Sequence, residues 1–307
     1  MLSIVVPMHN ESDVLELLFA RLERVVVSLG VQVEFVCVDD GSRDETLSRL
    51  EARAVADSRI KIVALARNFG KEAALTAGLD ESTGDLIVLL DADLQDPPEL
   101  MADFIDLWEK GYDVVYGVRT DRTADTMSKR VTANMFYRIF NRVADYPIPA
   151  STGDFRLMDR QVVEAVRQLP ERNRFNKGLF SWVGFRQVGV PYVRPARAAG
   201  TTSWASLALW RLAIDGITSF STLPLRVWSL VGFGAAVAAI LYGLGLIVRV
   251  LMFGRDVPGY ASLMVVLLFC FAFQMIAFGV MGEYIGRLYQ ETKHRPLYII
   301  RRNGEGE

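Results

Sequence analysis

Two aspartates and a glutamine stand at alternate positions directly after a short apolar run. The run is Leu86–Leu90, and Asp91, Asp93 and Gln95 follow it. Five apolar residues in succession predict a strand that is buried on both faces of a parallel sheet. Oxygen donors at this spacing suit a hard divalent cation such as Mg²⁺ or Mn²⁺. The alternative is a polar turn in which Asp96 caps the following helix, and these residues alone leave both interpretations open.

Polar clusters also follow two earlier apolar segments. They are Pro7-Met8-His9-Asn10-Glu11, after Leu2–Val6, and Asp39-Asp40-Gly41-Ser42, after Phe35–Val38. Each has a local structural interpretation, since Pro7 would end its strand, Gly41 permits a turn, and the next helix could be capped by Asn10, Glu11 or Ser12. However, the carboxyl ends of parallel strands meet at one edge of a sheet, where open α/β proteins place their ligands. Three polar clusters at that edge favour a binding site.

Strand and helix patterns alternate over residues 1 to about 120 and must position these clusters. We expect strands at Leu2–Val6, Phe35–Val38, Ile60–Ala64, Leu86–Leu90 and Val114–Tyr116, and helices at Asp13–Leu29, Asp44–Ala56 and Lys71–Glu81. This order predicts an α/β fold with a mostly parallel sheet flanked by helices. The sequence has neither a dinucleotide fingerprint after its first strand nor a P-loop motif, which excludes those two nucleotide sites.

Composition excludes several other classes of protein. The chain has 34 basic and 36 acidic residues, so nothing indicates a nucleic-acid partner. Its 2 cysteines, Cys37 and Cys270, are too few for a disulfide framework. The first predicted strand begins at Leu2, so we expect no cleavable signal peptide.

Two charge-free apolar runs, Val227–Val248 and Val257–Gly282, lie in the C-terminal third. Each exceeds the roughly 20 residues that span a bilayer core of about 30 Å. Their short connection predicts a transmembrane hairpin in the lipid bilayer. Basic residues before and after the hairpin indicate that both of its ends are cytoplasmic; they are Arg226, Arg287, Lys293, Arg295, Arg301 and Arg302.

We therefore divide the chain into four parts. Residues 1–200 form a cytoplasmic α/β domain, 201–226 form interfacial amphipathic helices, 227–282 form the hairpin, and 283–307 form a cytoplasmic basic tail. The interfacial helices are predicted from helical spacing of apolar residues with Trp204 and Trp210 among them. An ordinary helix packed on the core is the alternative for that segment.

Several segments carry a resemblance to a known family. They are PMHNE, VDDGSRDET, ARNFGKEAALTAGL and LLDADLQDPPE, then GDFRLMDR at 153–160, RFNKGLFSWVGFRQ at 174–187 and IDGITSFSTLPLR at 214–226. In this order they resemble the inverting nucleotide-sugar glycosyltransferases of family 2. More narrowly they resemble the polyprenyl-phosphate glycosyltransferases, a group that includes bactoprenol glucosyltransferase and dolichol-phosphate mannose synthase. The resemblance covers nearly the whole chain and implies the GT-A fold.

The resemblance implies transfer of a hexose from a nucleotide-sugar donor to a polyprenyl phosphate acceptor, with inversion at the anomeric carbon. UDP-glucose and undecaprenyl phosphate are the expected substrates, at the cytoplasmic face of the inner (plasma) membrane. Alternative donors are GDP-mannose, UDP-N-acetylglucosamine and a UDP-aminoarabinose derivative. A catalytically silent protein that binds lipid phosphate and partners a flippase is another alternative. Relatives also suggest a homo-oligomer.

The family pattern further implies a role for each motif. Pro7, His9, Asn10 and Glu11 would line the nucleotide pocket, with Asp39 or Asp40 accepting hydrogen bonds from the base. Asp91, Ala92 and Asp93 would lie against the donor, and Asp91, Asp93 and Gln95 would hold Mg²⁺ or Mn²⁺ on its diphosphate. The side chains expected near the phosphates or the acceptor are Lys71, Arg119, Arg130, Asp154, Lys177 and Arg197. Among these, Asp154 would be a positioning residue or a weak base, and Arg119 and Arg130 would bind phosphate through their guanidinium groups.

Some of these residues also have simpler interpretations, or depart from the family pattern. Lys71 would otherwise only begin a helix, and Asp154 would be a turn residue after Gly153. His9 stands where the family usually has a tyrosine, which changes the stacking expected against the base. Ser203 stands where relatives usually have a lysine, so the contact of that lysine is not expected here.

Overall fold

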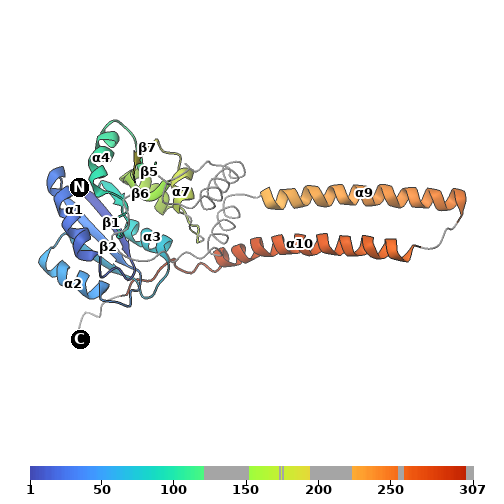
Figure 1. The fold of residues 1–307 in the computed structure, drawn as a ribbon, viewed down its shortest axis with the longest axis horizontal. Coiled ribbons are helices and arrows are strands. Elements are labelled where there is room, and N and C mark those ends of the chain that lie inside the picture. The colour runs from blue at the N-terminus through green and yellow to red at the C-terminus, as the bar shows by residue number, and fades with distance from the viewer. Residues whose placement is uncertain (121–151, 173, 175, 194–222, 255–258, 302–307) are drawn as a thin grey trace. The chain divides into compact units, whose positions relative to one another are not determined.

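The computed structural model describes residues 1–120, 152–172, 174, 176–193, 223–254 and 259–301 (Figure 1). The chain divides into two compact units, one formed by Met1–Gly216 with Arg295–Glu307 and the other by Ile217–His294. The first unit contains a seven-stranded sheet with its helices, and the second contains two long helices. Arg130, Arg197 and most of the predicted interfacial segment lie outside the described residues.

The sheet has the strand order β3-β2-β1-β4-β6-β5-β7. Its strands are β1 (Leu2–Met8), β2 (Val33–Asp39), β3 (Ile60–Ala64), β4 (Leu86–Leu89), β5 (Val114–Arg119), β6 (Thr152–Asp159) and β7 (Gln187–Tyr192). All of them run parallel except β6, which is antiparallel to both of its neighbours, β4 and β5. The prediction of a mostly parallel sheet is confirmed.

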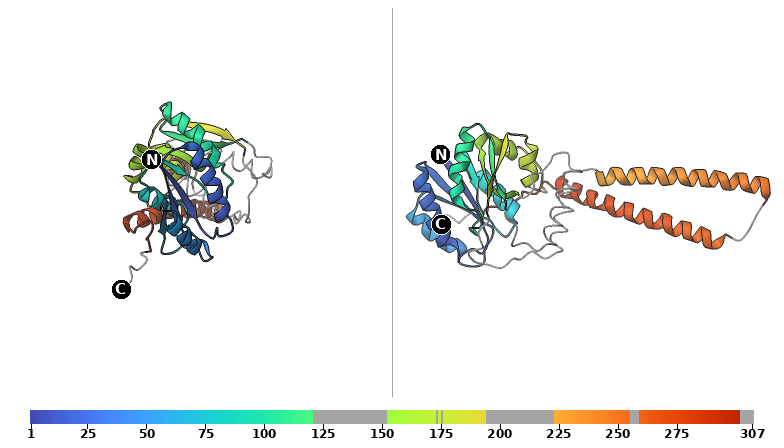
Figure 2. Two further views of the ribbon diagram at one scale, coloured as in Figure 1. Left: turned by 90° about the vertical axis from the view of Figure 1, so that its left-hand side faces the viewer. Right: turned by 45° about the horizontal axis from the view of Figure 1, so that its top comes forward.

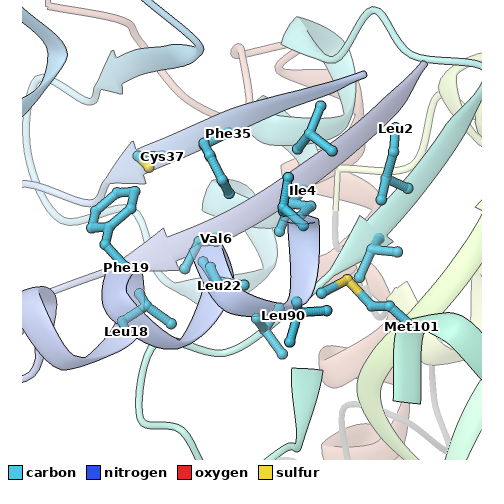
Figure 3. Close-up of a cluster of buried hydrophobic side chains, with 14 of the residues drawn as sticks. Leu2, Ile4, Val6, Leu18, Phe19, Leu22, Phe35, Cys37, Leu90 and Met101 are labelled. Carbon is cyan, nitrogen blue, oxygen red and sulfur yellow. The ribbon is translucent and has the colours of Figure 1, made fainter. Parts of the chain in front are cut away.

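Helices cover both faces of the sheet (Figure 2). They are α1 (Leu15–Leu29), α2 (Thr46–Ala56), α3 (Lys71–Glu81), the 3₁₀ turn η1 (Pro98–Leu100), α4 (Met101–Glu109), α6 (Arg160–Arg167) and α7 (Asn176–Trp182). Leu2, Ile4 and Val6 of β1 pack with α1 in one buried cluster (Figure 3). Val5 packs with residues of α3 and α6 in a second cluster on the opposite face. Burial on both faces explains why the central strands are apolar at successive positions.

Strand β1 continues through Pro7 to Met8, so the prediction that Pro7 ends this strand is wrong. The carbonyl of Met8 accepts from Asp40 of the β2 side, whereas the carbonyl of Val5 accepts from Leu90 of the β4 side. Alternate residues of a parallel strand bond to opposite neighbours. Pro7 therefore faces the β4 side, where pairing has already ended at Val5 and Leu89. Its missing N–H removes no bond from the sheet.

The second unit contains α9 (Leu223–Phe253) and α10 (Tyr260–Thr292). Within them, Val227–Gly245 and Ser262–Thr292 are long and apolar enough to cross a membrane, and 0% of each is buried. An apolar helix in the core of a soluble protein is covered by other parts of the chain. Among the described residues, neither stretch is covered in this way. At 1.5 Å per residue, helices of 31 and 33 residues exceed the roughly 30 Å bilayer core.

Candidate functional site

The polar clusters after β1 and β2 contact each other at the carboxyl edge of the sheet. His9 Nδ1 lies 2.9 Å from the carbonyl oxygen of Asp40, and the amide of Asn10 donates to Ser42 Oγ at 3.0 Å. Asn10 Oδ1 in turn accepts from the amide of Arg43 at 2.8 Å. These bonds hold together two segments that are distant in the sequence. The side-chain nitrogen Nδ2 of Asn10 also lies 3.1 Å from Nε2 of His9.

Asp39 and Asp40 have different environments. The carboxylate of Asp40 accepts from the amides of Phe69 at 2.7 Å and Gly70 at 2.9 Å, so it anchors the loop that enters α3. Burial raises the pKa of Asp40, against the lowering effect of these two amides. Asp39 Oδ2 accepts from the amide of Ser42 at 3.3 Å, while its Oδ1 is buried without a hydrogen-bond partner among the described residues. Asp39 is therefore the better candidate to accept a hydrogen bond from a base.

Gly41 closes the turn after β2 in a backbone conformation that few other residues adopt. Its φ is +64°, and a Cβ atom at this position would lie 2.5 Å from backbone atoms of Arg67 and Asn68. Any side chain here would displace the loop that follows β3. The turn after β2 and the loop before α3 are thereby held in direct contact.

The turn after β4 contains a strained residue. Leu94 has a φ of 58°, which is unusual for a large apolar side chain, and that side chain is buried. Asp93 Oδ1 accepts from the amide of Gln95 at 3.1 Å, and Gln95 Oε1 is buried without a partner among the described residues. A buried amide oxygen without a protein partner is available to bind a ligand.

The interpretation of Asp96 as the cap of the next helix is wrong. The turn η1 begins after Pro97 without a side-chain cap, and Asp96 is fully buried instead. Its carboxylate accepts a hydrogen bond from the hydroxyl of Tyr192 at the end of β7 and lies 3.8 Å from the Arg119 guanidinium. Arg119 Nε also donates to that hydroxyl, at 3.2 Å. Asp96 thus joins the turn after β4 to the ends of β5 and β7.

Arg119 lies beside the strand that carries Asp154. A Cβ atom on Gly153 would be 2.9 Å from Arg119 Nη2, so glycine leaves room for the guanidinium over β6. Burial lowers the pKa of Arg119, but the nearby Asp96 carboxylate outweighs it and the net shift is upward. Arg119 is therefore a fixed cation at the site edge.

Lys71 brings Asp91 and Asp154 together. Its Nζ lies 2.6 Å from Asp91 Oδ1, 2.8 Å from Asp91 Oδ2 and 2.6 Å from Asp154 Oδ2. Lys177 Nζ lies 3.7 Å from Asp154 Oδ1. Lys71 begins α3, as predicted, and its side chain also reaches the predicted site. The structure thereby joins four of the predicted residues in one cluster of two ammonium and two carboxylate groups.

The charges of this cluster shift its pKa values in opposite directions. Burial raises the pKa of Asp154, but the ammonium groups of Lys177 and Lys71 outweigh it and hold the pKa well below its usual range. Burial also raises the pKa of Asp91, and here it prevails over the contact with Lys71. Asp154 is therefore ionised at neutral pH and too weakly basic to be an efficient proton acceptor.

Three further charged or polar groups adjoin the cluster and were not predicted from the sequence. Glu72 Oε2 accepts from the amide of Asn176 at 3.0 Å, and burial beside Asp154 raises the pKa of Glu72 to about 7. Arg156 lies 4.2 Å above the ring of Phe180, and burial lowers its pKa to about 10. The sequence signal for Glu72 was its position directly after Lys71.

The donor atoms at this edge suit a divalent cation that is shared with a ligand. Among the described residues, no three His, Cys, Asp or Glu side chains are grouped so as to hold a metal ion. Asp91, Asp93 and Gln95 offer two carboxylates and an amide oxygen after one strand. Mg²⁺ is commonly bound by one or two carboxylates together with phosphates of a substrate. The residues fit a metal that is completed by a phosphorylated ligand, and Lys71 contributes a second cation there.

Comparison with known proteins gives a family match over the N-terminal half of the chain and relatives that match nearly all of it. The profile of glycosyl transferase family 2 matches residues 3–167. An uncharacterized glycosyltransferase of Synechocystis sp. is 52% identical over 97% of this chain and 94% of the relative. A prophage bactoprenol glucosyl transferase homolog of Escherichia coli K12 is 46% identical over 98% of both chains, and the bactoprenol glucosyl transferase of Shigella phage SfV is 46% identical over 98% of both. A crystal structure of glucosyl-3-phosphoglycerate synthase from Mycobacterium tuberculosis gives a TM-score of 0.44 at 21% identity, covering 71% of this chain and 80% of that one.

Proposed function

Because the chain belongs to glycosyltransferase family 2, we propose that it transfers glucose from UDP-glucose to the phosphate of a polyprenyl phosphate, with inversion at the anomeric carbon. The glucose and the lipid acceptor are supported by the bactoprenol glucosyl transferases that match over nearly the full chain. The observation that carries the proposal is the Lys71 cluster beside the turn after β4, where a diphosphate and a divalent cation would meet.

The donor is proposed to lie along the carboxyl edge of β1, β2 and β4. Asp39 Oδ1, buried without a partner among the described residues, would accept from the uracil base, and His9 would border it. Asp91, Asp93 and Gln95 would hold Mg²⁺ or Mn²⁺ against the diphosphate. When bound, the cation supplies Lewis-acid stabilisation of the leaving group. The ammonium of Lys71 would lie beside the same phosphates and stabilise the negative charge that develops on the leaving diphosphate.

The acceptor phosphate needs little help from a base. A phosphate monoester has a second pKa of about 6, so it is largely dianionic at neutral pH. Asp154, whose pKa is held low, would act by orienting Lys71 and Lys177. Lys177 and Arg119 would bind the acceptor phosphate. The phosphate oxygen would then attack the anomeric carbon from the face opposite the diphosphate, which inverts that centre.

The two apolar helices support action at a membrane, where a polyprenyl chain resides. Residues after the second helix form hydrogen bonds within the first unit, which also contains the chain up to Gly216. Two crossings return a chain to the side that it left, so this contact supports a hairpin with both ends on one side. We propose that this side is the cytoplasmic face of the inner membrane and that the protein acts as a homo-oligomer.

The test is a panel of radiolabelled nucleotide-sugars offered to membranes that contain the protein and added polyprenyl phosphate. The proposal expects UDP-glucose to label the lipid fraction, with a β-linked product from the α-linked donor. Labelling by GDP-mannose, UDP-N-acetylglucosamine or a UDP-aminoarabinose derivative in preference to UDP-glucose would replace the proposed donor. No labelling from any donor would favour a silent lipid-phosphate-binding protein that partners a flippase.

A further inference from the structure

The chain returns to the sheet after its second apolar helix. Leu65, directly after β3, forms an antiparallel bridge with Ile300. The amide of Ala66 donates to the carbonyl of Ile299 at 2.8 Å, and the amide of Arg301 donates to the carbonyl of Ala64 at 2.7 Å. We refer to residues 298–301 as the C-terminal strap. The strap pairs with the exit of β3, which is an edge strand of the sheet.

The strap also contacts the helix that follows β3. The Tyr298 hydroxyl donates to Asp80 Oδ2 of α3 at 2.7 Å, and the Tyr298 ring packs partly buried against the second core cluster. Asp80 is further paired with Arg167 of α6 at 3.2 Å. The strap therefore contacts the chain at two places: before α3, at Leu65 and Ala66, and in the last turn of α3, at Asp80.

The segment between these two contacts carries groups of the proposed donor site. Its backbone amides at Phe69 and Gly70 bind the Asp40 carboxylate, and its next residue is Lys71. Arg67 and Asn68 of the loop also pack so closely against Gly41 that a side chain at position 41 would not fit. Asp40 and Gly41 thus fix this loop from the side of β2, and the strap fixes it at Ala66 and through Tyr298.

We propose that the C-terminal strap is a positioning element of the donor site, which holds the loop before α3 so that Lys71 reaches the diphosphate. The inference rests on the proposed function, because it takes a nucleoside diphosphate as the ligand of that edge. It assigns a role in donor binding to residues that lie far from the donor motifs in the sequence, beyond the membrane helices. The strap residues do not touch the reacting atoms and act through the loop and α3.

Two proline substitutions test whether the hydrogen bond between the strap and the end of β3 is required for donor binding. Arg301→Pro removes the amide that donates to Ala64. Ile300→Pro is the matched control, because the bonds of this antiparallel pair come from the flanking residues and the amide of Ile300 points away from β3. Arg301→Gln keeps the backbone amide and removes the guanidinium group. Tyr298→Phe tests the contact with Asp80 and provides a milder variant if Arg301→Pro does not fold.

The measurement is the Kd for UDP in the presence of Mn²⁺, by calorimetry on the full-length protein in detergent, together with the donor KM and kcat. We expect Arg301→Pro and Tyr298→Phe to raise Kd and donor KM about fivefold, the factor that corresponds to one net hydrogen bond, with little change in kcat. Ile300→Pro and Arg301→Gln should keep the wild-type Kd. An unchanged Kd in both Arg301→Pro and Tyr298→Phe would overturn the role of the strap. A lower kcat with unchanged Kd and donor KM would also overturn it, because that result indicates only a smaller fraction of folded protein. If the wild type does not bind UDP, the proposed function itself fails and the strap proposal with it.

Discussion

The ammonium of Lys71 contacts both oxygens of Asp91, at 2.6 and 2.8 Å, although Asp91 is a proposed ligand of the divalent cation. One carboxylate cannot serve both cations in this geometry at once. Lys71 would therefore compete with a divalent cation for Asp91, and binding of the proposed metal-bound donor would require the ammonium to turn toward the phosphates. This relationship gives the first prediction.

Lys71→Met should bind Mn²⁺ more tightly than the wild type when no nucleotide is present. Removal of this ammonium frees both oxygens of Asp91 and takes a positive charge away from the proposed cation, so we expect about a tenfold lower Kd, equivalent to about 1.4 kcal/mol. Electron paramagnetic resonance of free Mn²⁺ measures it. Lys177→Met is the control, because the described contact of Lys177 is with Asp154, at 3.7 Å; its effect should be smaller. Equal or weaker binding in Lys71→Met would show that the lysine does not compete with the metal.

Asp154→Asn should lower kcat about tenfold or more without changing the shape of the pH profile. The pKa of Asp154 is held well below its usual range by Lys177 and Lys71, against the effect of burial. The carboxylate therefore stays ionised over the working range, and the ascending limb near pH 6 belongs to the acceptor phosphate. Rates of both proteins between pH 5 and 9 give the comparison. Loss of that limb in Asp154→Asn would identify Asp154 as the general base.

Glu72 should make the protein less stable as the pH rises from about 4.5 to 7. Burial raises its pKa from 4.5 to about 7 in the folded protein, so between these values the folded state holds a proton that the unfolded state has lost. Stability from this group is present at low pH and is lost by pH 7, by up to about 3 kcal/mol at 1.36 kcal/mol per pKa unit. Glu72→Gln should flatten this part of the thermal-stability profile. A profile that keeps the same slope in the variant would mean that Glu72 ionises normally.

Tyr192→Phe should destabilise the first unit by about 1.5–3 kcal/mol, the range for a hydrogen bond to a charged group. The hydroxyl of Tyr192 donates to the buried Asp96 and accepts from Arg119. Its removal would leave Asp96, already without a partner at Oδ2 among the described residues, with a further unmet oxygen. Denaturant unfolding of the detergent-solubilised protein measures the difference. A change below about 0.5 kcal/mol would mean that water replaces the hydroxyl.

The sequence was sufficient where local pattern and tertiary packing agree. Strand Ile60–Ala64 and helix Lys71–Glu81 have the bounds that were predicted, because a short run rich in β-branched residues defines the strand and Gly70 precedes the helix. The order of motifs also indicated which strand ends carry the proposed site. By contrast, the extension of β1 through Pro7 depends on which neighbour each residue faces, which is a property of the assembled sheet.

Contacts between distant segments could not be predicted from residue types. The interpretation of Asp96 as a helix cap failed because its observed partners, Tyr192 and Arg119, lie on strands that are distant in the sequence. The strap was included in a basic tail, although Tyr298-Ile299-Ile300 has the aromatic and β-branched residues that are typical of a strand. A four-residue segment of this kind becomes a strand only when an open sheet edge is available to pair with it.

The most direct test of the proposed function is transfer of radiolabelled glucose from UDP-glucose to polyprenyl phosphate by the purified full-length protein. Wild type and Asp93→Ala should be compared with Mn²⁺ and with a chelator. We predict labelled lipid from the wild type with Mn²⁺, loss of at least about 100-fold in rate with the chelator, and a similar loss in Asp93→Ala. Full activity of Asp93→Ala, or full activity of the wild type without a divalent cation, would contradict the assignment of this sheet edge as the metal-dependent donor site.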